Sequence, residues 1–205
     1  MGHALGHARD PQAARDRRPL TRALRYPAGV NPAANLTYGS YLKIPELLSL
    51  QKPLSKHPST GLPEHDEMLF IVIHQVYELW FKQQLHEGDF LARCLLEGKV
   101  QEAGATLKRM LTILKTMVQQ IDVLETMTPV SFLSFRSFLS NSSGFQSAQF
   151  REFEFLLGNK NPRVLAHNPE GSDERSVIER RFGQPTLYDA FARFVAGRGH
   201  KVPAG

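Results

Sequence analysis

The sequence predicts an all-α fold, a helical bundle whose long helices carry the core. Apolar residues recur at three- and four-residue steps along the chain, as on one face of a helix. No stretch alternates apolar and polar residues in the way a strand does. Ser, Thr, Pro and Gly stand where helices would begin and end. Together these observations favour a helical bundle over any fold built on a sheet.

The first hundred residues predict one short helix and one long helix. Residues 35–50 combine turn formers with aromatic residues, and Pro45 can open a short helix there. Residues 52–61 are typical of a loop. A long helix is expected to begin near 63–66, where acidic residues meet its positive end, and to run to Gly98.

Two features of the long helices bear on their packing. Gly88 is a weak point inside the first, because glycine lowers helix stability. A second long helix is expected at about 100–127, with one apolar stripe against a polar face, and is predicted to pack as half of a helical pair. The stripe consists of Leu107, Met110, Leu111, Leu114, Met117, Val118, Ile121 and Leu124.

Helix start and stop signals divide the rest of the chain. Thr128 can cap a helix that has Pro129 at its first position, and Gly158 can end a later one. Helices are expected at 130–139, 145–157, 173–182 and 186–196.

The net charge of +5 is concentrated at one end of the chain. Residues 1–30 hold six arginines and two acids, which leaves a charge of +1 for the rest. We therefore expect a basic, disordered N-terminal arm at 1–34, a helical domain at 35–205 and no nucleic-acid partner. The longest apolar run has six residues, too few to cross a membrane, and the single cysteine, Cys94, excludes an internal disulfide. We expect a cytoplasmic protein.

His74 is the first candidate for a functional residue. Phe70, His74, Tyr77 or Glu78, and Phe81 follow each other at helical spacing, so an imidazole lies beside aromatic rings on one face. Such a histidine is either a core residue with a satisfied hydrogen bond or part of a site, and periodicity alone leaves both open.

Arg136 is the second candidate. A guanidinium in apolar surroundings needs an anion, either an internal acid or the carboxylate of a ligand. Its planar fork suits the carboxylate of an amino acid, because two parallel hydrogen bonds fix the orientation. The apolar neighbours are Phe132, Leu133, Phe135, Phe138 and Leu139.

The remaining signals are weaker. Residues 142–144, Ser-Ser-Gly, either expose backbone N–H groups to an anion or serve as a helix cap. The motifs HExxH, GxGxxG, CxxC, GxSxG and the P-loop are all absent, so zinc-protease, nucleotide-binding and hydrolase functions have no local support.

Taken together, several ordered blocks resemble the tryptophan 2,3-dioxygenase family. They lie at 36–42, 65–75, 78–80, 135–136, 143–147 and 154–159. The resemblance covers residue 35 to the C-terminus. It implies an all-α haem protein that assembles as a homotetramer and opens the indole ring of L-tryptophan with O2 to give N-formylkynurenine, the first step of tryptophan breakdown.

The resemblance also implies site residues. His74 is the catalytic residue, on the distal side of the haem, where it accepts the indole N–H, and Arg136 binds the substrate carboxylate. Ser143 and Gly144 lie over the haem edge as cofactor-binding residues. Residues 37–42 reach into the pocket of a neighbouring subunit. The substrate-binding residues implied are Tyr38, Tyr41, Leu42, Phe70, Ile71, Val72, Ile73, His74, Phe132 and Arg136.

One departure from the family concerns the iron. Family members hold heme b through a histidine in a C-terminal helical region, followed by a loop rich in Gly, Thr and Ser, and neither precedes Gly205. We therefore expect a truncated member whose axial ligand is not within this chain, and we assign no metal ligand to His86, His167 or His200. Two alternatives are a non-catalytic helical assembly module derived from this fold and a haem relative that oxidises another aromatic amino acid.

Overall fold

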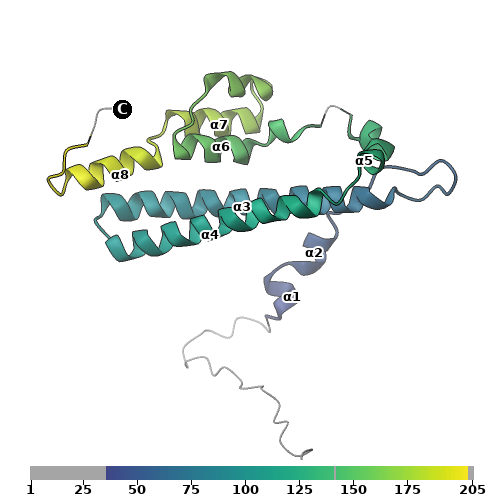
Figure 1. Cartoon of the computed structure of the whole chain (residues 1–205), viewed down its shortest axis with the longest axis horizontal. Coiled ribbons are helices and arrows are strands. Elements are labelled where there is room, and N and C mark those ends of the chain that lie inside the picture. Colours follow the sequence, from purple (N-terminus) through teal and green to yellow (C-terminus); the bar gives the residue numbers. More distant parts are fainter. Residues whose placement is uncertain (1–35, 141, 203–205) are drawn as a thin grey trace, which may run out of the picture. The chain divides into compact units, whose positions relative to one another are not determined.

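The structure, a computed structural model, describes residues 36–140 and 142–202. These residues form helices joined by loops, and no strand occurs among them, which confirms the predicted all-α class (Figure 1). The chain divides into two units, Met1–Pro45 and Glu46–Gly205. The basic arm predicted at 1–34 lies outside the described residues. In the described part, no helix is both long and apolar enough to cross a membrane.

The short helices near the N-terminus follow the local sequence signals. Thr37 caps α1 (Tyr38–Tyr41) by accepting the Ser40 N–H (3.2 Å), and Ser40 Oγ accepts the Thr37 N–H in return (2.9 Å). The second short helix, α2 (Ile44–Leu48), has Pro45 in its first turn, which confirms the short helix expected there.

Two long helices form the centre of the second unit. The first, α3 (His65–Leu96), and the second, α4 (Val100–Leu124), confirm the predicted helical pair. Gly98, at a φ of 72°, allows the chain to reverse between them. Side-chain hydrogen bonds join the antiparallel pair: Tyr77 to the Met117 carbonyl (2.6 Å), Trp80 to Gln120 (3.0 Å), Gln84 to the Met110 carbonyl (2.9 Å) and Arg109 to both carboxylate oxygens of Glu87 (2.8 and 2.9 Å).

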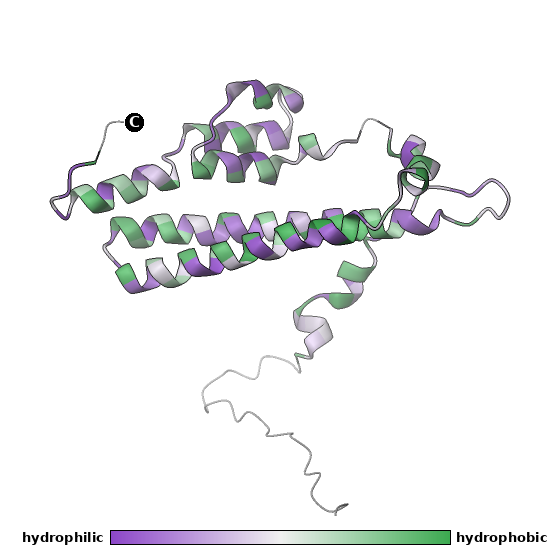
Figure 2. Cartoon of the chain, viewed as in Figure 1, coloured by the Kyte–Doolittle hydropathy of each residue, from purple (hydrophilic) through white to green (hydrophobic). Residues whose placement is uncertain are grey.

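The apolar stripe predicted on α4 is only partly interior. Met110 and Met117 are buried, whereas Leu107, Leu111, Val118 and Ile121 are exposed. Apolar and polar residues alternate along the visible face of α4 in Figure 2. The predicted apolar stripe is therefore wider than the buried face of α4. The buried residues of this helix are Ala103, Thr106, Met110, Ile113 and Met117.

The remaining helices confirm the start and stop signals, with small shifts. The helix predicted at 130–139 ends as an α-helix at Arg136 and continues as a 3₁₀ turn. The helix predicted at 145–157 begins later, because Ser147 is its N-cap and accepts the Phe150 N–H (3.1 Å). The elements are α5 (Pro129–Arg136), η2 (Ser137–Leu139), η3 (Gly144–Gln146), α6 (Ala148–Leu157), η4 (Pro162–His167), α7 (Asp173–Gly183) and α8 (Leu187–Ala196).

Helix α3 is the central helix of the second unit, because α4, α5, α6 and α8 all pack on it (Figure 1). Helices α3 and α6 approach each other closely at Gly88, where a Cβ atom would lie 2.4 Å from Leu156 Cδ2 of α6. The expectation of a weak point at Gly88 was therefore incomplete, since the glycine makes room for Leu156, one of the most buried side chains.

Paired glycine substitutions test this contact. Gly104 lies inside α4, and a Cβ atom there would meet nothing within 4 Å, so Gly104→Ala should raise the free energy of unfolding by about 0.5–1 kcal/mol. Gly88→Ala gains the same helical preference but must displace Leu156, and overpacking costs about 1–3 kcal/mol. Urea denaturation should therefore show Gly88→Ala to be less stable than the parent protein. Equal stabilisation by both changes would contradict the close contact.

The loop expected at 52–61 is confirmed. A buried carboxylate joins this loop to the first turn of α3. Glu67 accepts the N–H of Leu54 (2.8 Å), the N–H of Ser55 (2.9 Å) and the Ser55 hydroxyl (2.5 Å). Both Glu67 and Ser55 are nearly inaccessible to solvent. Burial raises the pKa of Glu67, but these hydrogen bonds outweigh it and hold the pKa below its ordinary value of 4.5.

The stability that Glu67 contributes should therefore depend on pH. A lowered pKa favours the folded state above the ordinary value of 4.5, and the contribution is lost as the pH falls through the folded pKa. Glu67→Gln should lower the free energy of unfolding by about 1.5–3 kcal/mol at pH 7. Urea denaturation between pH 7 and pH 3 should show the gap closing towards the acid end. A gap of constant size would mean that the charge of Glu67 plays no part.

Candidate functional site

A cavity of about 480 Å³ lies between three walls of the second unit. Helix α3 forms one wall, α5 and the turn after it form the second, and the loop at 142–147 forms the third. The lining residues are Phe70, His74, Glu78, Phe132, Arg136, Leu139, Ser142, Ser143, Gly144, Gln146 and Ser147. The structure thus brings together six of the residues predicted for the site, from three separate segments of the chain.

The α3 wall presents an imidazole beside aromatic rings. Phe70 and His74 lie one helical turn apart, with ring centroids separated by 4.0 Å. His74 Nδ1 lies 2.7 Å from the Phe70 carbonyl oxygen. Because a carbonyl oxygen can only accept, Nδ1 carries the proton, and Nε2 of the neutral ring is a hydrogen-bond acceptor. His74 is partly buried. Its hydrogen bond joins it to Phe70 of the same helix and does not tie the ring to another element.

The α5 wall presents a guanidinium. Thr128 caps this helix through the Ser131 N–H (3.1 Å), and the fully buried Phe135 anchors it against Phe70, with ring centroids 5.6 Å apart. Arg136 is partly buried and donates one hydrogen bond, from Nη1 to the Ser140 carbonyl (2.9 Å). Among the ion pairs between described residues, none involves Arg136. The internal acid that the sequence left open as its partner is therefore not found in the described part of the chain.

The third wall is a loop stabilised by its own hydrogen bonds. Ser143 caps the turn η3, because its hydroxyl accepts the Phe145 N–H (3.3 Å) and its N–H donates to Gln146 Oε1 (3.2 Å). This geometry fits the cap that the sequence offered as one of two readings of 142–144. A Cβ atom at Gly144 would meet nothing within 4 Å, so the packing of the described residues does not require a glycine there.

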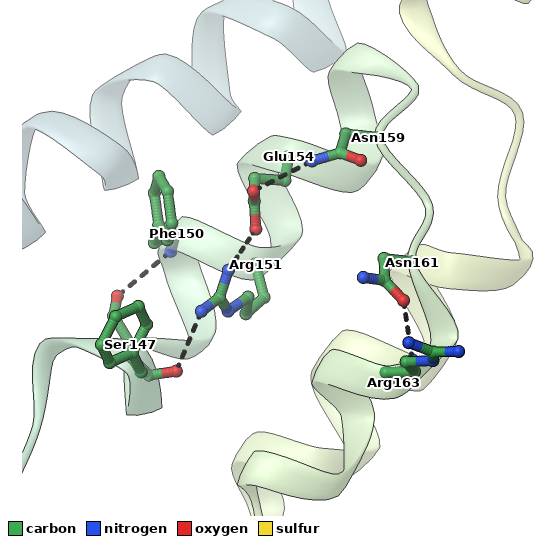
Figure 3. A network of polar contacts seen from close by, with 8 residues as sticks. Ser147, Phe150, Arg151, Glu154, Asn159, Asn161 and Arg163 are labelled. Carbon is green, nitrogen blue, oxygen red and sulfur yellow. Dashed lines mark hydrogen bonds and ion pairs between the residues drawn. The ribbon is translucent and has the colours of Figure 1, made fainter.

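A buried arginine supports this loop from α6. Arg151 pairs with Glu154 (2.5 Å) and donates from Nη2 to the Phe145 carbonyl (3.4 Å). Figure 3 shows Arg151 between Glu154 and the start of the helix, where Ser147 caps the Phe150 N–H. Arg151 therefore does not line the cavity but holds the loop that forms its third wall through the hydrogen bond to Phe145.

Several predicted site residues are not among those that line the cavity. Ile71, Val72 and Ile73 do not line it, since only Phe70 and His74 of this stretch share the same helix face. Ile73 is in the core and Val72 is exposed. Tyr38, Tyr41 and Leu42 belong to the N-terminal unit, where all three are exposed.

The lining also includes residues that the sequence analysis did not assign. Glu78 is one helical turn beyond His74; the spacing left Tyr77 and Glu78 as alternatives on this face, and Glu78 is the one that lines the cavity. Leu139, Ser142, Gln146 and Ser147 lie within three positions of an assigned residue along the chain. Within the described residues, no group of three or more His, Cys, Asp or Glu side chains is placed to hold a metal ion. His86, His167 and His200 do not line the cavity.

Comparison with known proteins gives a consistent result. Residues 28–184 match the family model described as tryptophan 2,3-dioxygenase. The chain is 53% identical over 170 residues to the tryptophan 2,3-dioxygenase of Herpetosiphon aurantiacus, covering 82% of this chain and 63% of that protein. It is 53% identical over 171 residues to that of Anaeromyxobacter sp. strain K, covering 83% and 62%. The chain thus spans less than two thirds of the length of these relatives. On this evidence, the chain belongs to the tryptophan 2,3-dioxygenase family.

Proposed function

We propose that this chain is the substrate-recognising part of a haem-dependent dioxygenase that opens the indole ring of L-tryptophan with O2 to give N-formylkynurenine. The observation that carries the proposal is the cavity, which combines an arginine without an ion-pair partner among the described residues, a histidine with an acceptor nitrogen and an aromatic wall. Family membership supports the same reaction.

Each group in the cavity suits one part of L-tryptophan. Arg136 binds the carboxylate through guanidinium N–H groups that Ser140 does not use. His74 Nε2 accepts the indole N–H, because Nδ1 already donates to Phe70. Phe70 and Phe132, whose ring centroids are 5.9 Å apart, pack on the indole and exclude water. The chain's own contribution is therefore to orient the substrate.

The residues present fit one side of a haem. Ser143 and Gly144 would lie over its edge, and the open space where Gly144 lacks a Cβ leaves room for a flat ring system. Phe70 and His74 would face it from the α3 wall. Bound haem supplies the activation of O2. No second histidine of the described residues lines the cavity, so the axial donor is not among the lining residues seen here.

We further propose a cytoplasmic homotetramer in which Tyr38, Tyr41 and Leu42 wall the pocket of a neighbouring subunit. Both tyrosines are more than 70% exposed, as expected for side chains that another subunit covers. The exposed apolar residues of α4 offer a second surface for assembly. A single unpaired cysteine is consistent with a reducing compartment.

The direct test uses the protein at the full length that its gene encodes, loaded with haem and supplied with L-tryptophan and O2. Formation of N-formylkynurenine with consumption of O2 is the expected result. Haem binding together with turnover of another aromatic amino acid, but not of L-tryptophan, would favour the relative with a different substrate. Failure to take up haem, with normal assembly, would favour the non-catalytic module.

A further inference from the structure

One hydrogen-bonded pair links two walls of the cavity. Gln149, in the first turn of α6, donates from Nε2 to the Glu78 carboxylate (2.8 Å) and to the Glu78 carbonyl oxygen (3.0 Å). Glu78 lines the cavity from α3, whereas Gln149 lies two residues beyond the loop that forms the third wall. The pair therefore joins α3 to the base of that loop.

The other hydrogen bonds of this region are local. Within residues 137–150, each of the remaining hydrogen bonds between described residues joins partners six or fewer positions apart. Gln149 and Glu78 are 71 positions apart. The position of the loop relative to α3 thus depends on this pair together with apolar packing, such as Phe150 against Phe81, whose ring centroids are 5.3 Å apart.

The carboxylate of Glu78 takes no part in an ion pair between described residues. Its known contact is with a neutral amide, and it serves there as a hydrogen-bond acceptor. A neutral glutamine at position 78 could accept the same hydrogen bond through its amide oxygen. Glu78→Gln therefore distinguishes a positioning role of Glu78, which needs only a hydrogen-bond acceptor, from a role that needs its negative charge.

We propose that Glu78 and Gln149 form a clamp that holds the loop at 142–147 against α3 at the separation that the cavity requires. Gln149 is then a positioning residue, although it does not line the cavity. The effect of the clamp on tryptophan binding rests on the proposed function, whereas its effect on the loop does not.

Hydrogen exchange in the full-length protein tests the clamp. Gln149→Leu should speed amide exchange at 142–147 by about tenfold, while amides of α4 keep their protection. Gln120→Leu is the matched control, because it removes a partly buried side-chain hydrogen bond of similar length that Trp80 of α3 donates to Gln120 of α4 (3.0 Å). That control should leave exchange at 142–147 unchanged. Unchanged exchange in Gln149→Leu itself would overturn the proposal.

Substitutions of Glu78 separate the hydrogen bond from the charge. Glu78→Leu removes the carboxylate acceptor but keeps the carbonyl oxygen, so its loop exchange should lie between those of the parent protein and Gln149→Leu. Glu78→Gln should restore slow exchange because the amide oxygen still accepts. Equally fast exchange in both Glu78 variants would overturn the clamp in favour of a role for the charge.

Calorimetric titration with L-tryptophan then connects the clamp to the ligand. Gln149→Leu should weaken binding by about 3- to 10-fold, and Gln120→Leu should not. If the parent protein binds no L-tryptophan but the loop exchange changes as expected, the clamp stands and the proposed function fails. If Gln149→Leu speeds loop exchange but binds L-tryptophan as tightly as the parent protein, the loop position does not control binding and Gln149 is not a positioning residue.

Discussion

Replacing Arg136 by leucine in the full-length protein should raise the KM for L-tryptophan by roughly 30- to 4,000-fold. Loss of one partner of a desolvated charge pair removes about 2–5 kcal/mol of binding energy. The partly buried arginine lines the cavity with Phe70 and Phe132 and has no ion-pair partner among the described residues. On the proposed function, the carboxylate of the ligand is the anion that offsets its desolvation. Steady-state kinetics over a range of L-tryptophan concentrations measures the effect.

Two further variants give this prediction its controls. Arg136→Lys keeps the charge but loses the planar fork, so its KM should fall between those of the parent protein and Arg136→Leu. Arg163→Leu removes the same charge at an exposed position that does not line the cavity, and its KM should match that of the parent protein. An unchanged KM in Arg136→Leu would show that the carboxylate binds elsewhere.

Replacing His74 by alanine should lower kcat/KM by about 10- to 100-fold and leave the haem content intact. The expected loss is that of one hydrogen bond from the indole N–H to Nε2, about 1–3 kcal/mol. The hydrogen bond from Nδ1 to Phe70 fixes which nitrogen accepts, so the effect should depend on the N–H of the substrate. With 1-methyltryptophan, which has no indole N–H, the gap between parent and variant should narrow.

The haem content of the variant is the second readout for His74. Loss of haem would identify His74 as a ligand or a structural support and would contradict its place on the oxygen side. His86→Ala is the matched control, because His86 is an exposed histidine of the same helix that does not line the cavity. Its kinetics and haem content should equal those of the parent protein.

Local signals in the sequence predicted most of the fold. The cap Thr128 fixes a helix start through a hydrogen bond to a residue three positions away, so a short stretch of sequence contains the information. The cap Ser147 acts in the same way but was not recognised, and the helix expected from 145 begins at Ala148. Gly88 shows where this fails, because its role depends on Leu156 of another helix. The prediction of the α4 stripe fails for the same reason. Periodicity does not tell which apolar residues a partner helix covers, and half of the stripe is exposed.

The candidate site likewise contains residues that local spacing predicts and contacts that it cannot predict. Phe70 and His74 share a helix face through their four-residue spacing, and the same rule, applied one turn further, reaches Glu78. Ile71, Val72 and Ile73 entered the prediction because they belong to a continuous motif, and the helix turns them away from the cavity. The contact between Glu78 and Gln149 joins residues 71 positions apart, so no local pattern could indicate it.

Binding of L-tryptophan and of tryptamine, which lacks the carboxylate, to the full-length parent protein and to Arg136→Leu tests substrate recognition by this cavity most directly. Isothermal titration should show that Arg136→Leu weakens the binding of L-tryptophan by at least about 30-fold and leaves the binding of tryptamine unchanged, because a double-mutant cycle isolates one pairwise contact. Equal weakening of both ligands would contradict a contact between Arg136 and the substrate carboxylate.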